Sequence, residues 1–300
     1  MHDRTSWWTV TPDVFLGLVT HERSRFAEAT HENGLLSSLA RELRNLDLDV
    51  RTGVSDQDAY APDVLPLTRA VVKASIRGEL NCEQRWRTYL SGRKPRLRTK
   101  GLMAARWAWR RAKYVPPWRR FDGAGDLGAS MVRRLVNIEL SHLRIMGQAV
   151  ASGARWAILV EDDAAAPDTP VFARDIAEFI DAADKRRQPL TMNLSESFTP
   201  RQLGIEHLLT PIEEPGPWTM LAADRPVTNT VCAVLYRVDF LARLLTELQA
   251  IPLSPVIPID FKVNEAMMRL AISMKPGDCW VASPAPLVQR SGVPNVWVIA

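Results

Sequence analysis

The chain of 300 residues has an ordinary globular composition, with 46% hydrophobic and 24% charged residues and a formal net charge of +4. This composition excludes a disordered or fibrous protein, and the length suffices for a sizeable core. No segment approaches the roughly 20 apolar residues of a membrane-spanning helix, and the first residues show no apolar core of a signal peptide. Three widely spaced cysteines, Cys82, Cys232 and Cys279, predict a reduced, cytoplasmic protein without a disulfide framework.

The N-terminal part predicts a strand–helix–strand unit. Residues 14–20 form an apolar strand, leucines within 35–46 share one helical stripe, and residues 48–54 return as a second strand. Such units favour parallel strands, and ligands of parallel sheets bind beyond the carboxyl ends of the strands. The polar residues expected to bind a ligand there are Arg23, Arg25, Asp56 and Asp58. No GxGxxG or Walker sequence follows the first strand, which argues against a dinucleotide-type phosphate loop.

A basic, tryptophan-rich segment follows this unit. Residues 84–120 include 13 Arg or Lys and no Asp or Glu, and their tryptophans are Trp86, Trp107, Trp109 and Trp118. Arginine interleaved with tryptophan favours an anionic membrane surface or a nucleic acid. The alternative is a solvated insertion whose tryptophans pack back on the core. We interpret residues 84–125 as an insertion within a single domain of residues 1–300. We expect peripheral contact of residues 84–120 with an anionic membrane, at its cytoplasmic face, and no specific nucleic acid.

Three consecutive acids end a third apolar strand. Residues 156–160 read WAILV, which is typical of a strand buried on both faces, and Glu161, Asp162 and Asp163 follow directly. Neighbouring carboxylates repel one another, so a cation, a positive partner or solvation at the sheet edge must offset the repulsion. Because side chains alternate along a strand, Glu161 and Asp163 are expected to point the same way and Asp162 the other way.

The helix predicted at residues 130–152 leads directly into this strand. His142 lies on a mostly apolar flank of that helix. One interpretation is a core histidine whose hydrogen bonds are satisfied. The other is a member of a site at the acidic end of the following strand.

The order of these two elements resembles the family 25 glycosyltransferases, the lipopolysaccharide and collagen galactosyltransferase group. Those proteins show an LSH helix followed by an apolar strand that ends in EDD, as LSH at residues 140–142 and EDD at 161–163 do here. The resemblance covers residues 137–165 well, and continues more loosely through residues 228–230, 259–260 and 283–291. It implies a GT-A-like (Rossmann-like) α/β fold with a mostly parallel central sheet flanked by helices.

The resemblance also implies a function, which is sugar transfer from a nucleotide-sugar donor, with a UDP-sugar favoured, to a glycan or lipid-linked acceptor. A hard divalent ion, Mn²⁺ or Mg²⁺, would neutralise the pyrophosphate leaving group, and carboxylate oxygens suit such ions. By the acidic motif of the family, Asp163 is the expected metal ligand together with Glu161. His142, Glu161 and Asp162 are expected to contact the nucleotide sugar.

An inverting transferase also needs a carboxylate that takes the proton of the acceptor hydroxyl. Asp260 matches the "pvD" position of the family and is the predicted base, with Asp224 and Glu196 as alternatives. Because Asp260 begins a predicted helix, it is also a candidate N-cap. The sequence leaves inversion and retention both open. Further strands are predicted at residues 189–194, 231–236 and 284–289, and further helices over residues 240–248 and from residue 258 onward.

Two other functions stay open from the sequence. A metal-dependent phosphohydrolase would also use acids at a strand end, but it should carry several Asp and His ligands, and the chain has five histidines. A non-catalytic adaptor would bind an anionic membrane or a nucleic acid through residues 84–120. The adaptor interpretation gives the acidic strand end no role.

Overall fold

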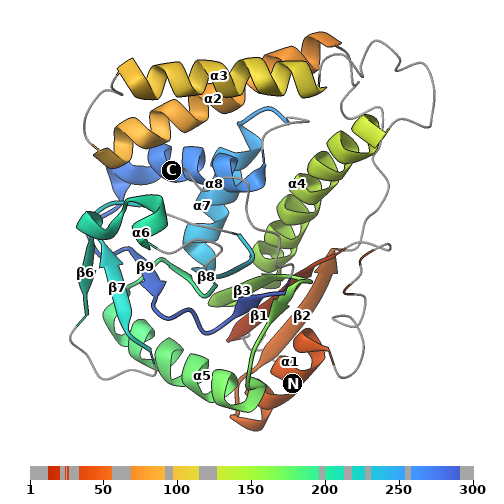
Figure 1. Cartoon of the computed structure of the whole chain (residues 1–300). Helices are drawn as coiled ribbons and strands as arrows, with labels where there is room; N and C mark the ends of the chain where they lie inside the picture. The colour runs from red at the N-terminus through yellow and green to blue at the C-terminus, as the bar shows by residue number, and fades with distance from the viewer. Residues whose placement is uncertain are drawn as a thin grey trace, which may run out of the picture.

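An eight-stranded sheet forms the centre of the protein (Figure 1). The computed structural model describes residues 13–20, 24, 26, 34–55, 69–91, 97–114, 127–195, 200–212, 218–226, 231–253 and 258–290. The strands are β1 (Val14–Val19), β2 (Val50–Ser55), β3 (Trp156–Glu161), β4 (Ala164–Ala165), β5 (Thr191–Asn193), β6 (Leu209–Pro211), β7 (Met220–Ala223), β8 (Ala233–Arg237), β9 (Cys279–Ala282) and β10 (Val288–Gln289). The helices are α1 (Leu35–Asn45), α2 (Arg69–Ser91), α3 (Leu97–Tyr114), α4 (Leu127–Ser152), α5 (Thr169–Arg186), α6 (Pro200–Leu203), α7 (Val238–Gln249) and α8 (Ile259–Leu270), with 3-10 turns η3 (Glu206–Leu208) and η4 (Ala271–Ser273).

The strand order of the sheet is β2-β1-β3-β8-β5-β9-β7-β6. β2, β1, β3, β5, β9 and β6 run in one direction, and β8 and β7 run in the opposite direction. The sheet is therefore mixed, although most of its strands share one direction. The α/β class and the helix-flanked central sheet predicted from the sequence are confirmed, and this architecture is compatible with a Rossmann-like fold.

The central strands are apolar throughout because each contributes to two cores. In β3, Trp156, Ile158 and Val160 pack with α1 and α5, whereas Ala157 and Leu159 pack with α4, α7 and α8. Figure 1 shows these two groups of helices on opposite faces of the sheet. Burial on both faces explains the continuous apolar run that precedes the acids.

A glycine lets α4 lie close to the sheet. A Cβ atom at Gly17 of β1 would lie 2.6 Å from Ile145 Cγ1 and 2.7 Å from Leu159 Cδ2, so no larger residue fits without displacing its neighbours. Close approach of a helix is one of the few reasons for glycine inside a strand. The helix that bears His142 therefore packs closely against β1 and β3.

The basic segment is built from two long helices. Residue 84, the predicted start of an insertion, falls inside α2, because a change of charge along the chain does not interrupt helical hydrogen bonding. α4 likewise begins at Leu127, three residues earlier than predicted from the sequence. Among the described residues, no helix combines the length and apolar character that crossing a bilayer requires.

A buried ion pair fastens α8 to α4. The ammonium of Lys262 contacts the carboxylate of Glu139, and both side chains are 1% exposed. Lys262 Nζ also donates to the carbonyl oxygen of Pro252 at 2.8 Å. Burial lowers the pKa of Lys262, and the charge of Glu139 opposes that change. Two buried charges that compensate each other fix the relative position of the helices that bear them.

Lys262→Met is therefore expected to lower the free energy of unfolding by about 3–5 kcal/mol, because the buried carboxylate of Glu139 loses its ion-pair partner. The double variant Lys262→Met/Glu139→Leu should recover most of that loss. Urea denaturation followed by circular dichroism measures both. Lys185→Met, which removes an exposed pair with Asp181, is the control and should cost less than about 1 kcal/mol. A single variant as stable as the parent would contradict this account.

Candidate functional site

The acidic residues lie where the chain leaves β3, between β1 and the start of β8. The backbone N–H of Glu161 donates to the carbonyl oxygen of Cys232 at 2.7 Å, and that of Asp162 donates to the carbonyl oxygen of Val19 at 3.0 Å. Asp162 and Asp163 then form a turn that leads into β4. These backbone contacts place all three acids at the carboxyl edge of the central strands.

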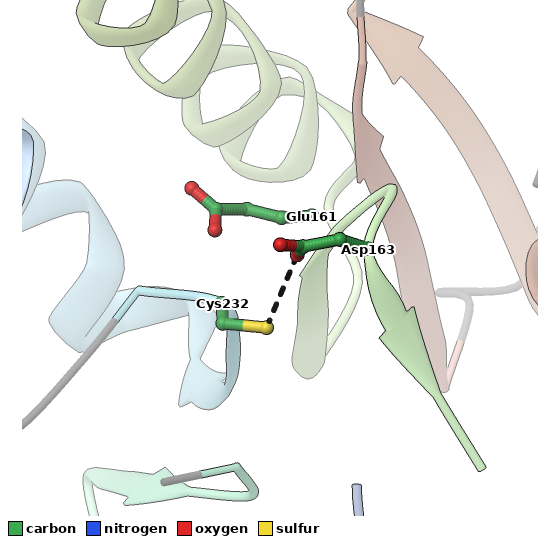
Figure 2. A group of neighbouring side chains, drawn as sticks. All are labelled: Glu161, Asp163 and Cys232. Atoms are coloured by element: carbon green, nitrogen blue, oxygen red, sulfur yellow. Dashed lines mark hydrogen bonds between the residues drawn. The ribbon is translucent and has the colours of Figure 1, made fainter. Parts of the chain in front are cut away.

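Two of the acids converge with a cysteine (Figure 2). A carboxylate oxygen of Glu161, one of Asp163 and the Sγ atom of Cys232 all lie within 4.8 Å of one another. Asp162 points away, and its Oδ2 accepts a hydrogen bond of 2.6 Å from Thr20 Oγ1, just beyond β1. The shared direction of Glu161 and Asp163 agrees with the expectation from strand alternation, although a turn, and not the strand, positions Asp163.

Glu161 is held from its buried side by His142. The Nε2 atom of His142 lies 3.0 Å from Glu161 Oε1, and His142 is 1% exposed. Nε2 donates this hydrogen bond in the forms of the imidazole that carry a proton on Nε2. Both interpretations of this histidine therefore apply, since it is a core residue with a satisfied hydrogen bond and a member of the acidic site.

Asp163 is buried and receives two side-chain donors. Gln289 Nε2 donates to Asp163 Oδ2 at 3.0 Å, and the thiol of Cys232 donates to Asp163 Oδ1 at 3.6 Å. Burial raises the pKa of the Cys232 thiol well above its ordinary value, and the negative charges of Glu161 and Asp163 raise it further. Cys232 is thus a neutral donor here and not a thiolate.

The strand β10 closes the site from the C-terminal side of the chain. It pairs antiparallel with β4, which directly follows the acids, and the backbone N–H of Arg290 donates to the carbonyl oxygen of Asp163 at 2.7 Å. The predicted strand at residues 284–289 is thereby reduced to two residues, which lie in a small separate sheet. Gln289 of this strand nevertheless contributes the side chain that hydrogen-bonds Asp163.

Asp260 lies in the first turn of α8, beside the same cluster. Its Oδ1 accepts a hydrogen bond of 3.1 Å from the backbone N–H of Val231, the residue before Cys232. Asp260 keeps part of its surface exposed, but desolvation raises the pKa of its carboxyl to about 6; the charge of Glu161 adds to this rise, and His142 opposes it. These electrostatic couplings make Asp260, Glu161 and His142 neighbours. The N-cap of α8 is Pro258, so the alternative interpretation of Asp260 as the N-cap is wrong.

The other residues predicted from the sequence either lie outside the described part of the chain or lie away from this cluster. Arg23, Arg25, Asp56, Asp58 and Glu196 lie outside the described residues. Asp224 follows β7, which runs opposite to β3, so it lies at the other edge of the sheet. Asp260 is therefore the only one of the three proposed bases that the described part of the chain brings to the acids.

Sequence reasoning missed three residues of the site, Thr20, Cys232 and Gln289. Cys232 reaches the acids because β8 pairs antiparallel with β3, so the start of one strand meets the end of the other. A pairing of strands more than 70 residues apart leaves no local pattern in the sequence. Gln289 lies within residues 283–291, which are part of the resemblance to the family 25 glycosyltransferases. That motif was the sequence signal that could have placed Gln289 at the site.

The cavities along α2 do not coincide with the acidic cluster. One of about 430 Å³ is lined by Asn81, Gln84, Arg85, Thr88 and Tyr89, all on one face of the helix. A second of about 550 Å³ lies between α2 and α3, with Trp107 in its wall. The first is lined by the cation Arg85, the phenol of Tyr89 and neutral polar groups, and it contains no carboxylate.

Asp260→Asn is expected to stabilise the protein in a pH-dependent way. An acid whose pKa is higher in the folded than in the unfolded protein, here about 6 against 3.8, binds more protons when folded. Parent stability therefore falls as the pH rises through this window, by about 3 kcal/mol, and the asparagine variant does not show this loss. The variant should melt above the parent at pH 7 and alongside it at pH 4. A melting difference independent of pH would contradict burial of the charge as its cause.

The chain matches no family model and no curated protein sequence. The resemblance to the family 25 glycosyltransferases therefore rests on the residues themselves. The two motifs that carry it are joined in the structure by one hydrogen bond, between His142 of the LSH helix and Glu161 of the EDD strand end.

Proposed function

We propose that the protein is a metal-dependent glycosyltransferase that moves a sugar from a nucleotide-sugar donor to a hydroxyl acceptor. The observation that carries this proposal is the convergence of Glu161 and Asp163 at the carboxyl end of β3, with Asp260 beside them. In open α/β sheets, ligands bind beyond the carboxyl ends of the strands, where the strand order reverses. β1 lies between β2 and β3, so such a reversal occurs next to the acids.

The donor set fits a hard divalent cation. Two carboxylates within 4.8 Å repel each other, and Mn²⁺ or Mg²⁺ bound by their oxygens would offset that repulsion. Such ions keep several positions for water and substrate phosphate oxygens, so two protein ligands suffice. When bound, the ion would neutralise the charge that develops on the nucleoside diphosphate leaving group. The neutral thiol of Cys232 serves as a donor to Asp163.

The surrounding side chains orient the carboxylates. His142 holds Glu161, Gln289 and Cys232 hold Asp163, and Thr20 turns Asp162 toward the end of β1. Hydrogen bonds to ligand residues fix their geometry and typically account for about 10- to 100-fold in metal affinity. Asp162 and Glu161 then border the space in which the nucleotide would lie, and a UDP-sugar is the favoured donor.

Asp260 supplies the general base. A carboxyl whose pKa is raised to about 6 is ionised at neutral pH yet more basic than an exposed aspartate, which suits proton removal from the acceptor hydroxyl. Its hydrogen bond from Val231 orients the group without neutralising it. The acceptor class that agrees with this arrangement is a glycan or lipid-linked hydroxyl.

Asp163→Asn is expected to abolish metal-dependent nucleotide binding, because it removes one ligand charge but keeps an acceptor for Gln289. Isothermal titration calorimetry with UDP, with and without Mn²⁺, measures this. Asp168→Asn is the matched control, since Asp168 is the exposed N-cap of α5 and asparagine caps helices equally well. If the Asp163 variant bound UDP and Mn²⁺ as the parent does, the metal site would have to be reassigned.

Asp260→Asn is expected to leave donor affinity unchanged and to lower the transfer rate by about 10²- to 10⁴-fold, the usual effect of losing a general base. Sugar release from a panel of nucleotide sugars, combined with donor titration, separates rate from affinity. Asp239→Asn, a substitution at the exposed acid in the first turn of α7, should change neither. Equal turnover by parent and Asp260 variant would refute the base assignment.

A further inference from the structure

The outermost layer of the described structure is α3, which packs on α2 (Figure 1). α2 in turn packs on α8, and its aromatic side chains Trp86 and Tyr89 face the core. Trp86 and Tyr89 stack with ring centroids 6.0 Å apart and pack against the core cluster that includes α7 and α8. The aromatic residues of α2 are therefore committed to the fold, in agreement with the core-packing interpretation for this half of the basic segment.

α3 behaves differently, because much of its apolar surface faces solvent. Met103 is buried, but Leu97, Leu102 and Trp109 are 86%, 48% and 53% exposed. The small residues exposed on the same helix are Gly101, Ala104, Ala105, Ala108 and Ala112. At 100° per residue, these apolar positions lie on the side of the helix opposite Met103, and the position of Arg98 falls among them.

Positive charge accompanies this face. α3 carries six Arg or Lys residues and no Asp or Glu in its 18 residues. Lys100, which is exposed, and Arg106, which is half-buried, lie on the two flanks of the apolar face. An apolar face with leucine and tryptophan, flanked by basic residues, is typical of helices that lie in the interface of an anionic membrane.

We propose that the exposed face of α3, defined by Leu97, Leu102 and Trp109 with Lys100 and Arg106 at its flanks, docks on an anionic lipid bilayer. At the boundary of the acyl chains, leucine and alanine side chains are removed from water, which is favourable. Proteins bind single-stranded nucleic acids mainly through cations at the phosphates and aromatic rings that stack on the bases, and aliphatic side chains supply neither contact. The tryptophan side chain would lie at the depth of the lipid headgroups. The flanking basic residues would be attracted to the anionic lipids. The proposal rests on this surface alone and is independent of sugar transfer.

Co-sedimentation of the full chain with phosphatidylcholine vesicles, with and without phosphatidylglycerol, tests the proposal. The measurement uses no nucleotide or metal, so its outcome is separate from that of the transferase proposal. The parent should pellet with the anionic vesicles, less with the neutral ones, and less as salt increases. The variant Leu97→Gln/Leu102→Gln/Trp109→Gln should lose at least about tenfold in partitioning, because three large side chains no longer leave water. Circular dichroism verifies that this surface variant is folded.

Two further variants make the test specific. Lys100→Glu should weaken binding to anionic vesicles several-fold without changing binding to neutral ones. Ile272→Gln, at an apolar residue of η4 that is 98% exposed, should bind as the parent does. The proposal is overturned if the parent does not pellet with anionic vesicles at low salt, or if the triple variant pellets equally well. A parent that instead shifts single-stranded RNA, with the triple variant shifting it equally, would also overturn it.

Discussion

Repulsion between carboxylates at the end of β3 is the constraint on which the site depends. Glu161 and Asp163 are brought within 4.8 Å of each other, in partly and fully buried positions, where unpaired charge is costly. Three other parts of the chain supply side chains that hydrogen-bond these two carboxylates, namely His142 to Glu161, and Cys232 and Gln289 to Asp163. The charge of Glu161 also adds to the rise in the pKa of Asp260, whose main cause is desolvation.

Residues outside the site hold α4 and α8, the helices that carry His142 and Asp260, in position. α4 lies close to β1 because Gly17 has no side chain, and α8 is tied to α4 by Lys262 and Glu139. Glu139 is one helical turn before His142, and Lys262 is two residues after Asp260. The ion pair thus sets the separation of the two helices from which the histidine and the proposed base extend, so packing and chemistry share the same two elements.

The sequence predicted the elements whose signal is local. The strand and acids of residues 156–163, the helix with His142 and the position of Asp260 near them follow from apolar runs and motif order, and they appear in the structure. β9 was missed because its four buried residues follow a glycine and an aspartate and form too short a run. Cys232 and Thr20 joined the site through strand pairing, which depends on contacts distant in sequence. Charge composition located the basic segment but did not show that α2 faces inward and α3 outward.

The hydrogen bond from Gln289 to Asp163 spans 126 residues of chain, and this separation has a consequence during protein synthesis. At typical elongation rates, a ribosome needs roughly 6 to 25 s to add that many residues. Throughout this interval the acids are already made, but β4 has no β10 to pair with and Asp163 lacks its amide donor. The nascent chain therefore carries an incomplete, negatively charged strand end, and the competent site appears only after most of the domain has been translated.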